Sequence, residues 1–386
     1  LFPELLRENG YWVGLEGRHH HLDGKLESKE APHILEALNQ MRMKELDERL
    51  DYVNVTKTKG AYLAKVAERF SQTLDEVPEN KPFFLYFGFN QPHRKFGDDH
   101  EGIDPKELLL PPDFPDLPGV RLDYARYLAE VRDLDAGIGF IERILRERGL
   151  KESTMVIFMG DNGEALLRGK GTLYRRGLNV PLMVRWPGKV RAGAVKDALV
   201  SGVDIAPTIL EAAGLEKNRN MTGVSFLPLL KGQNYKGRQV IFAERGWHHG
   251  QITRTNGLDF SRSVVTKKYN YIYNALPDRV YTPVDMEHKN VAWEEIKRAH
   301  DTKKLKPLHE KLFFLKPRPI FELYDKSKDP HELHNLAGSA AFRDIETELR
   351  QELDKEMIRE SDYLPLPSHV FDLLNQKRKM ENKTAR

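Results

Sequence analysis

Two kinds of hydrophobic pattern alternate over the first part of the chain. Continuous apolar runs at 83–87, 155–159 and 181–186 predict strands that are buried on both faces. Apolar residues at the helical period predict amphipathic helices at 57–77 and 121–148. Strands that alternate with helices are typical of an α/β layer structure, so we expect a mostly parallel sheet sandwiched by helices.

The pattern changes after about residue 245. Short runs of β-branched and aromatic residues at 263–265, 269–273 and 321–324 predict strands separated by turns. These strands predict a smaller antiparallel α+β unit that packs on the first. We therefore expect one domain over residues 1–245 and a C-terminal subdomain over residues 246–386.

Composition narrows the class of protein. The 386 residues are 40% apolar and 31% charged, which is ordinary for a soluble globular protein. The longest apolar stretch, 83–89, is far too short to span a membrane. A net charge of +3 does not suggest a nucleic-acid partner. With no cysteine, the chain holds no disulfide, zinc–thiolate site or thiol nucleophile.

Polar side chains follow two of the predicted strands. In an open parallel sheet, ligands bind beyond the carboxyl ends of the strands. One strand leads to His93 and another to Asp161 and Asn162, which precede Gly163. Carboxylate and amide oxygens suit a hard divalent ion such as calcium. The alternatives are a plain turn at Asp161 and Asn162 and a structural role for His93.

A lysine between two glycines is the next candidate. Gly169 and Gly171 allow backbone to approach an anion closely, and Lys170 supplies a compact positive charge. A phosphate-binding P-loop is excluded, because five residues rather than four separate Gly163 from Gly169, and no Ser or Thr follows the lysine. The alternative is a mobile surface lysine.

Arg18 and His20 lie in a basic run that follows a short predicted strand and contains three consecutive histidines. Such a run suits an anion site. It is also compatible with a solvated loop or with chelation of a stray transition metal.

Taken in order, these motifs resemble the sulfatases of the alkaline-phosphatase-like superfamily. The resemblance is closest to the heparan N-sulfatase (N-sulfoglucosamine sulfohydrolase) branch, in which a His-His pair precedes an Arg-Ser-Val strand, as His248 and His249 precede 262–264. The matching segments are 17–20, 82–86, 92–94, 161–163, 169–174, 180–188, 204–208, 283–285 and 322–336.

The resemblance implies that Asp161 and Asn162 hold one Ca²⁺. It implies a sulfated sugar or glycosaminoglycan as substrate, bound in part by His248 and His249, although the pair could instead pack or cap a loop at the domain junction. It also implies a periplasmic, secreted or lysosomal protein, while no signal peptide is evident at the start of the chain. The side chains that would contact the sulfate or the leaving group are Arg18, in place of the usual lysine, His20, His93 and Lys170.

One part of the family pattern has no counterpart in the chain. The resemblance implies an N-terminal strand with two Asp metal ligands and a formylglycine nucleophile made from a Cys-x-Pro-x-Arg or Ser-x-Pro-x-Arg motif, which is absent here. We therefore expect residues 1–245 to be a sulfatase catalytic domain without that strand and nucleophile. Covalent catalysis needs the attacking group, so we expect these 386 residues alone to release no sulfate.

Two other functions compete with a sulfuric ester or sulfamate hydrolase. A phosphodiesterase or phosphonate hydrolase of the same superfamily would share the metal and the sheet. A glycan-binding pseudoenzyme would keep the binding groups without catalysis. The sequence predicts no oligomeric state.

Overall fold

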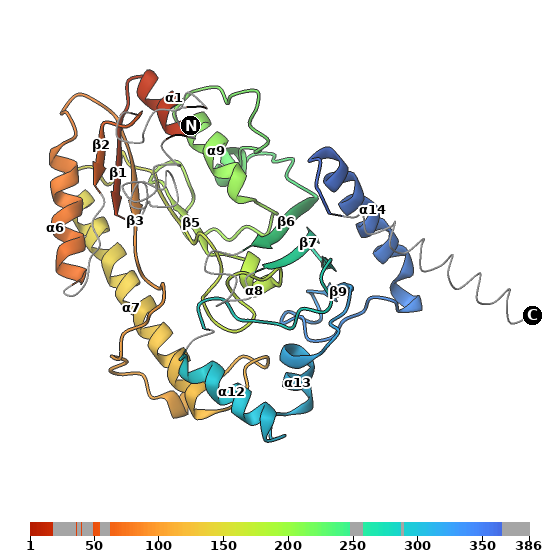
Figure 1. The fold of residues 1–386 in the computed structure, drawn as a ribbon. Helices are drawn as coiled ribbons and strands as arrows, with labels where there is room; N and C mark the ends of the chain where they lie inside the picture. The colour runs from red at the N-terminus through yellow and green to blue at the C-terminus, as the bar shows by residue number, and fades with distance from the viewer. Residues whose placement is uncertain are drawn as a thin grey trace, which may run out of the picture.

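The structure is a computed structural model that describes residues 1–17, 36, 40, 49–54, 62–247, 258–286 and 289–364. Within these residues the strands form a three-stranded sheet, a two-stranded sheet and a four-stranded sheet. Figure 1 shows the three-stranded sheet beside α6 and the four-stranded sheet on the opposite side, next to α14.

The three-stranded sheet is parallel, as predicted. Its central strand is β1 (Trp12–Gly17), which lies between β2 (Tyr52–Asn54) and β3 (Phe83–Gly88) and runs parallel to both. All six residues of β1 are buried. The alternating faces of this strand therefore contact helices on both sides.

Helices cover the two faces of this sheet. On one face, Val13 and Leu15 pack with residues of α1 (Phe2–Glu8) and α9 (Ile205–Ala212). On the other face, β3 packs with α6 (Tyr62–Asp75) and α7 (Pro118–Glu147). This arrangement confirms the predicted sheet between helices (Figure 1).

The long helix predicted at 121–148 is α7. It begins three residues earlier, because Pro118 occupies its first turn, where a missing N–H costs nothing. It ends before Gly149, whose φ of 69° is the left-handed conformation that terminates many helices. The helix predicted at 57–77 is α6, and residues 57–61 lie outside the described ranges.

The prediction that three strands are buried on both faces is wrong. Tyr86 in β3 is 45% exposed, Met159 in β4 (Val156–Met159) is 39% exposed and Met183 in β5 (Leu182–Arg185) is 59% exposed. β4 and β5 pair antiparallel to each other. A continuous apolar run indicates how apolar a strand is, but it does not indicate whether a neighbouring layer covers both faces.

The four-stranded sheet is antiparallel, as predicted for the C-terminal part. Its order is β6 (Val240–Trp247), β7 (Leu258–Thr266), β8 (Tyr269–Asn274) and β9 (Phe321–Asp325). α14 (Arg343–Arg359) packs on one face of this sheet. The predicted division of the chain at residue 245 stays a prediction, and β6 begins shortly before it.

A further core joins the two parts of the chain. Leu166 and Leu167, from the loop after β4, pack with Val120 of α7 and with Trp293 and Ile296 of α12. The remaining helices and 3-10 turns are α8 (Arg175–Leu178), α10 (Leu227–Leu230), α12 (Val291–Asp301), α13 (Pro307–Phe314), η1 (Pro105–Glu107), η2 (Gly202–Asp204) and η3 (Ala340–Phe342).

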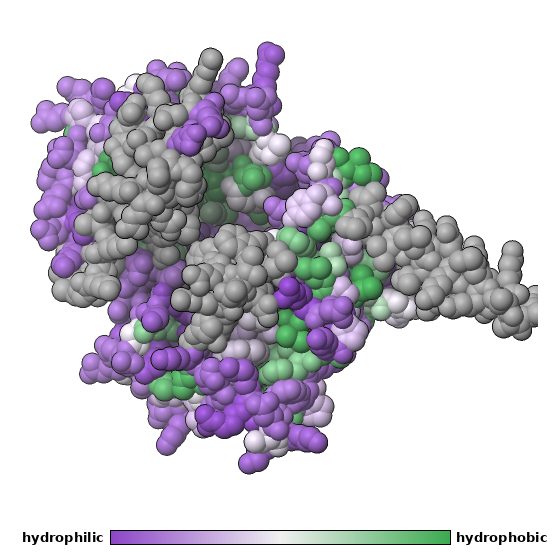
Figure 2. Space-filling view, in the orientation of Figure 1, coloured by the Kyte–Doolittle hydropathy of each residue, from purple (hydrophilic) through white to green (hydrophobic). Residues whose placement is uncertain are grey.

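Hydrophilic residues cover the α6 side and the α12 end of the face shown in Figure 2, and hydrophobic residues show near its middle and beside α14. Among the helices that the structure describes, none has the length and apolar character needed to cross a membrane.

Candidate functional site

His93 and Lys170 lie together although 77 positions separate them in the chain. The Lys170 Nζ is 3.3 Å from His93 Nε2. It also donates a hydrogen bond of 2.7 Å to Asp285 Oδ2, which lies 3.9 Å from His93 Nε2. The three side chains remain partly exposed, at 30% for His93, 11% for Lys170 and 20% for Asp285. We call these three side chains the Lys170 cluster.

Arg94 positions the loop that carries His93. Its guanidinium pairs with Asp123 of α7, with Nη1 to Oδ1 at 2.9 Å, and both side chains are buried. Its Nε donates to the carbonyl of Ala165 at 2.7 Å, in the loop that carries Lys170. A buried ion pair is costly to break, so Arg94 holds these two loops together.

The ring of His93 has a defined orientation. Its Nδ1 contacts the carbonyl oxygen of Arg94, so Nδ1 carries the proton that is donated there. The other nitrogen, Nε2, faces the ammonium of Lys170. In the neutral ring Nε2 is the acceptor, so this nitrogen is the one able to take up or release a proton at the site.

Backbone hydrogen bonds fix the conformation of the loop that carries Lys170. The Lys170 N–H donates to Glu164 O at 2.8 Å, and the Gly163 N–H donates to Gly177 O at 3.1 Å. A Cβ on Gly163 would overlap the carbonyl oxygen of Arg176. Only glycine therefore allows the start of this loop to pack so closely against α8.

Gly171 brings the C-terminal part of the chain to Lys170. It has a φ of 76°, and a Cβ at this position would overlap Val284 Cγ2. Val284 precedes Asp285, which itself has a φ of 63°. Gly171 therefore allows Asp285 to approach Lys170 closely. This role is additional to the close approach of an anion that the sequence suggests.

Asp161 and Asn162 lie where the sequence predicts, at the carboxyl end of β4. Both side chains are exposed at the start of the loop that carries Lys170. One carboxylate and one amide oxygen fit a hard divalent ion, but calcium takes six to eight oxygens, so the pair is only part of a shell. In the part of the chain that the structure describes, no three His, Asp, Glu or Cys side chains form a metal-binding group.

The other predicted site residues, Arg18, His20, His248 and His249, lie outside the described residues. The strand that precedes Arg18 is described: Gly17 of β1 pairs with Gly88 of β3. Because β1 and β3 are parallel, Gly17 ends β1 at the edge of the sheet from which the loop with His93 begins. The roles of all four residues stay predictions.

Asp285 is the member of the cluster that the sequence did not predict as a site residue. The segment 283–285 resembles a marker of the N-sulfatase branch, and this was the only signal available. A lone aspartate after Pro and Val has no local feature that points to a lysine 115 positions earlier.

Comparison with protein-family models identifies the family of this chain. The family model "Sulfatase" matches residues 1–215, which is more than half of the chain. The chain belongs to the sulfatase family. A second model, "N-sulphoglucosamine sulphohydrolase, C-terminal", matches residues 163–314 of this sulfatase, which include Lys170 and Asp285.

Two curated relatives support this assignment. The sulfatase is 32% identical over 269 residues to an ulvan-active sulfatase of Formosa agariphila, a match that covers 69% of this chain and 43% of the relative. It is 29% identical over 325 residues to the N-sulphoglucosamine sulphohydrolase of Homo sapiens, a match that covers 75% of this chain and 62% of the relative. The matches thus span about half of the relatives' length.

A solved structure supports the fold. The sulfatase superposes with a TM-score of 0.67 and 18% identity on a protein in complex with its substrate D-glucosamine-2-N,6-O-disulfate. The likeness covers 95% of this chain and 83% of the other. It confirms the predicted fold class of a parallel sheet between helices with a smaller antiparallel part.

Proposed function

We propose that the Lys170 cluster binds the sulfate group of a sulfated sugar, in an enzyme that hydrolyses sulfuric esters or sulfamates. The observation that carries the proposal is the 3.3 Å contact of Lys170 Nζ with His93 Nε2, in loops that follow β3 and β4. A partly exposed cation beside an imidazole suits a group that is anionic throughout the reaction. The family supports the reaction class.

Each side chain has a distinct task in this proposal. Lys170 neutralises charge on the sulfate oxygens through charge-assisted hydrogen bonds. His93, protonated at Nε2, gives that proton to the departing amine or hydroxyl, while its Nδ1–H stays on the Arg94 carbonyl. Asp285 accepts a hydrogen bond from Lys170 and so keeps the ammonium oriented before the substrate binds.

We further propose that Asp161 and Asn162 supply two oxygens to a calcium ion. Such an ion would neutralise charge on the sulfate oxygens when bound. Calcium should raise the melting temperature of the protein, and Asp161→Ala should abolish this shift. Asp197→Ala is the matched control, because this exposed aspartate pairs only with an exposed lysine among the described residues. An equal calcium shift in Asp161→Ala would exclude the assignment.

The preferred substrate in this proposal is an N-sulfoglucosamine end. Its support is the C-terminal family model over residues 163–314, a range that includes both partners of the Lys170–Asp285 contact. His248 and His249 would bind the sugar. A sulfated glycan as substrate also favours a periplasmic, secreted or lysosomal location.

Binding tests this function without turnover. Calorimetric titration of the 386-residue chain with N-sulfoglucosamine should give saturable binding, and glucosamine should bind far more weakly. Lys170→Ala should weaken binding about 10- to 100-fold, the effect of losing about 1.5–3 kcal/mol from a charged hydrogen bond. Lys189→Ala, at an exposed lysine, should leave binding unchanged. Equal affinity in wild type and Lys170→Ala would overturn the proposal.

The same titration tests the finer assignment. Tighter binding of 6-O-sulfated N-acetylglucosamine would exclude the N-sulfatase branch, and tighter binding of an aryl phosphodiester would favour the phosphodiesterase alternative. His248→Ala and His249→Ala should each weaken N-sulfoglucosamine binding. Unchanged specificity in both variants would remove the pair from the site.

A further inference from the structure

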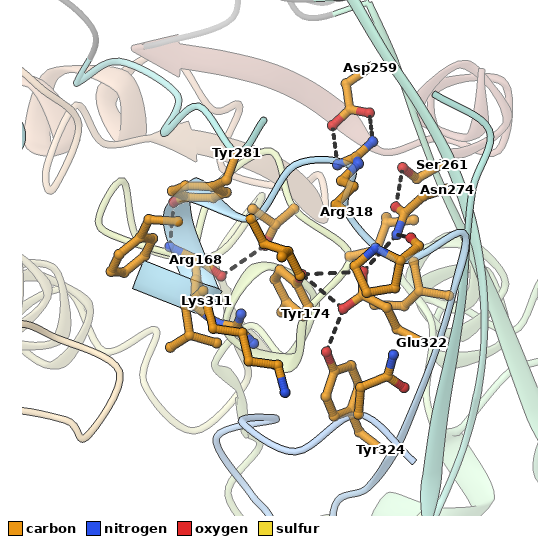
Figure 3. A pocket seen from close by; sticks show the side chains of 18 of the residues that line it. Arg168, Tyr174, Asp259, Ser261, Asn274, Tyr281, Lys311, Arg318, Glu322 and Tyr324 are labelled. Atoms are coloured by element: carbon orange, nitrogen blue, oxygen red, sulfur yellow. Dashed lines mark hydrogen bonds and ion pairs between the residues drawn. The ribbon is translucent and has the colours of Figure 1, made fainter. Parts of the chain in front are cut away.

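A second group of cations lines a cavity of about 70 Å³ between residues 168–174 and the antiparallel sheet (Figure 3). Among the described residues that line it, none belongs to the Lys170 cluster. The cavity is therefore distinct from the site proposed above. Its polar walls include Arg168, Tyr174, Arg245, Asp259, Arg318 and Glu322.

One carboxylate serves two arginines in this cavity. Asp259 pairs with Arg318, as Figure 3 shows, and the same carboxylate lies 3.1 Å from Arg245 Nη1. The two guanidinium groups therefore lie close together around a single negative charge. The pair of arginines keeps one positive charge in excess.

Among the described contacts, the second carboxylate forms no ion pair with Arg245 or Arg318. Glu322 accepts hydrogen bonds from Asn274 at 2.6 Å, from Tyr174 at 3.1 Å and from Tyr324 (Figure 3). Neutral donors thus solvate Glu322. With Lys311 and Arg168 included, the described lining residues carry four cations and two carboxylates.

Two buried N–H groups lack partners. Within the described ranges, Arg245 Nε and Arg318 Nε are buried and have no hydrogen-bond partner. A buried donor without a partner costs about 1–3 kcal/mol. Burial, together with the positive charge of Arg318, holds the pKa of Arg245 below its ordinary value although Asp259 opposes the shift. Both facts indicate that Asp259 alone does not satisfy the two guanidinium groups.

The size of the cavity limits what can enter. One water needs about 10–15 Å³ of such space, so about 70 Å³ holds a few waters or one small anion, but not a sugar ring. Lys311 lines the cavity and is exposed, which places this lysine at the mouth. An anion would therefore pass one cation before it meets two more.

We propose that this cavity binds one inorganic tetrahedral oxyanion, sulfate or phosphate, through the N–H groups of Arg245 and Arg318, with Lys311 at its mouth. Guanidinium groups match the oxygens of such anions with paired, charge-assisted hydrogen bonds. The bound anion would satisfy the two Nε–H groups and neutralise the surplus charge. This site is independent of the sulfated-sugar site and does not rest on it.

Titration with inorganic anions tests the proposal in a Lys170→Ala background, where the Lys170 cluster no longer contributes. Sodium sulfate and sodium phosphate are compared with sodium chloride at equal ionic strength. One of the two oxyanions should bind with a stoichiometry of one, and the tighter of them identifies the natural ligand. Binding of neither oxyanion beyond the chloride control would overturn the proposal.

Variants locate the bound anion. Arg245→Gln should abolish binding. Lys311→Gln, at an exposed position that should leave folding intact, should weaken binding about three- to tenfold. Lys316→Gln is the matched control, since this lysine is also exposed and is not among the described lining residues. Equal affinities in the Lys311 and Lys316 variants would count against the site.

A crystal soaked with selenate would show directly where the anion binds, because selenium scatters anomalously. A peak between Arg245 and Arg318 would support the site even if Arg245→Gln does not fold. Selenate bound only elsewhere would overturn the proposal.

Discussion

Arg168 and Lys170 belong to the same loop and are separated by one glycine, yet their environments are opposite. The Arg168 side chain is 2% exposed, donates to the carbonyl of Glu332 at 2.7 Å and lies 3.7 Å from the centre of the Tyr174 ring. Lys170 keeps 11% of its side chain exposed and meets only other titratable side chains in the described structure.

The difference separates a structural cation from one that can bind a ligand. The partners of Arg168 are a backbone carbonyl, an aromatic ring and the buried carboxylate of Asp113, which cannot leave without unfolding the region. The partner of Lys170 is a partly exposed carboxylate, and such ion pairs contribute little to stability, so an incoming anion can replace it. Burial, rather than charge, therefore decides which cation is available.

The largest effect is expected from Arg168→Ala. This variant leaves the buried carbonyl of Glu332 without its donor, removes one of the two arginines beside Asp113 and opens a void beside Tyr174, so we expect the free energy of unfolding to fall by about 3–5 kcal/mol. Urea denaturation measures the loss. Arg175→Ala, at a neighbouring exposed arginine, should change stability by less than about 0.5 kcal/mol. Similar stabilities of the two variants would show that the buried Arg168 contributes no more to stability than an exposed arginine.

Gly171→Ala should give the next largest effect, because its Cβ would overlap Val284 and its φ of 76° is strained for alanine. We expect a loss of about 2–4 kcal/mol, from overpacking and backbone strain together. Gly188→Ala is a matched control: its φ of 68° is similar, but its Cβ would meet open space, so the loss should be about 1 kcal/mol. Adding Val284→Ala should recover part of the Gly171→Ala loss. No recovery would show that Val284 is not the obstacle.

A smaller effect is expected from Asp285→Asn. Removing the carboxylate that faces Lys170 should tighten the binding of inorganic sulfate about two- to tenfold, as for an ion pair of about 0.5–1.4 kcal/mol. In a Lys170→Ala background the same change should have no effect, which titration of the four proteins would show. Asp278→Asn, at an exposed aspartate, is the control. Weaker sulfate binding in Asp285→Asn would contradict the proposal that sulfate replaces Asp285 as the partner of Lys170.

The last effect depends on pH and concerns Lys326, a cation of intermediate burial. Burial lowers its pKa to about 8, and its Nζ donates to Thr266 O at 2.6 Å. Between about pH 8 and pH 10.5 the unfolded chain holds this proton more than the folded chain does, so stability should rise with pH in that window. Lys326→Met should flatten this rise in urea denaturation, and Lys328→Met should not. If the free energy of unfolding of Lys326→Met rises with pH as steeply as that of the wild type, Lys326 is not the source of the pH dependence.

Parts of the fold follow from local pattern alone. The apolar period over 121–148 predicts α7 to within three residues at its start and one at its end, where Gly149 follows the helix. The apolar runs predict β3, β4 and β5, but not their exposure, since Tyr86 and Met183 are as apolar in sequence as buried residues are. Exposure depends on which layers pack on each face.

The sequence also predicts some residues of the site and misses others. His93 and Lys170 follow strands of an expected parallel sheet, and the rule that ligands bind at carboxyl ends is enough to mark both. Asp285 comes from another part of the chain and reaches Lys170 only because Gly171 allows Val284 to approach. Nothing within its own segment indicates that contact.

By itself the sequence determined the alternation of strands and helices in the first part of the chain, the family resemblance, and the residue types that could meet an anion. The tertiary structure alone decided that Arg168 is locked while Lys170 is available, and that Arg245 and Arg318 share one carboxylate. The physical reason is that a local pattern records the polarity of each residue, whereas burial and pairing depend on segments about 60 to 160 positions away that packing brings together.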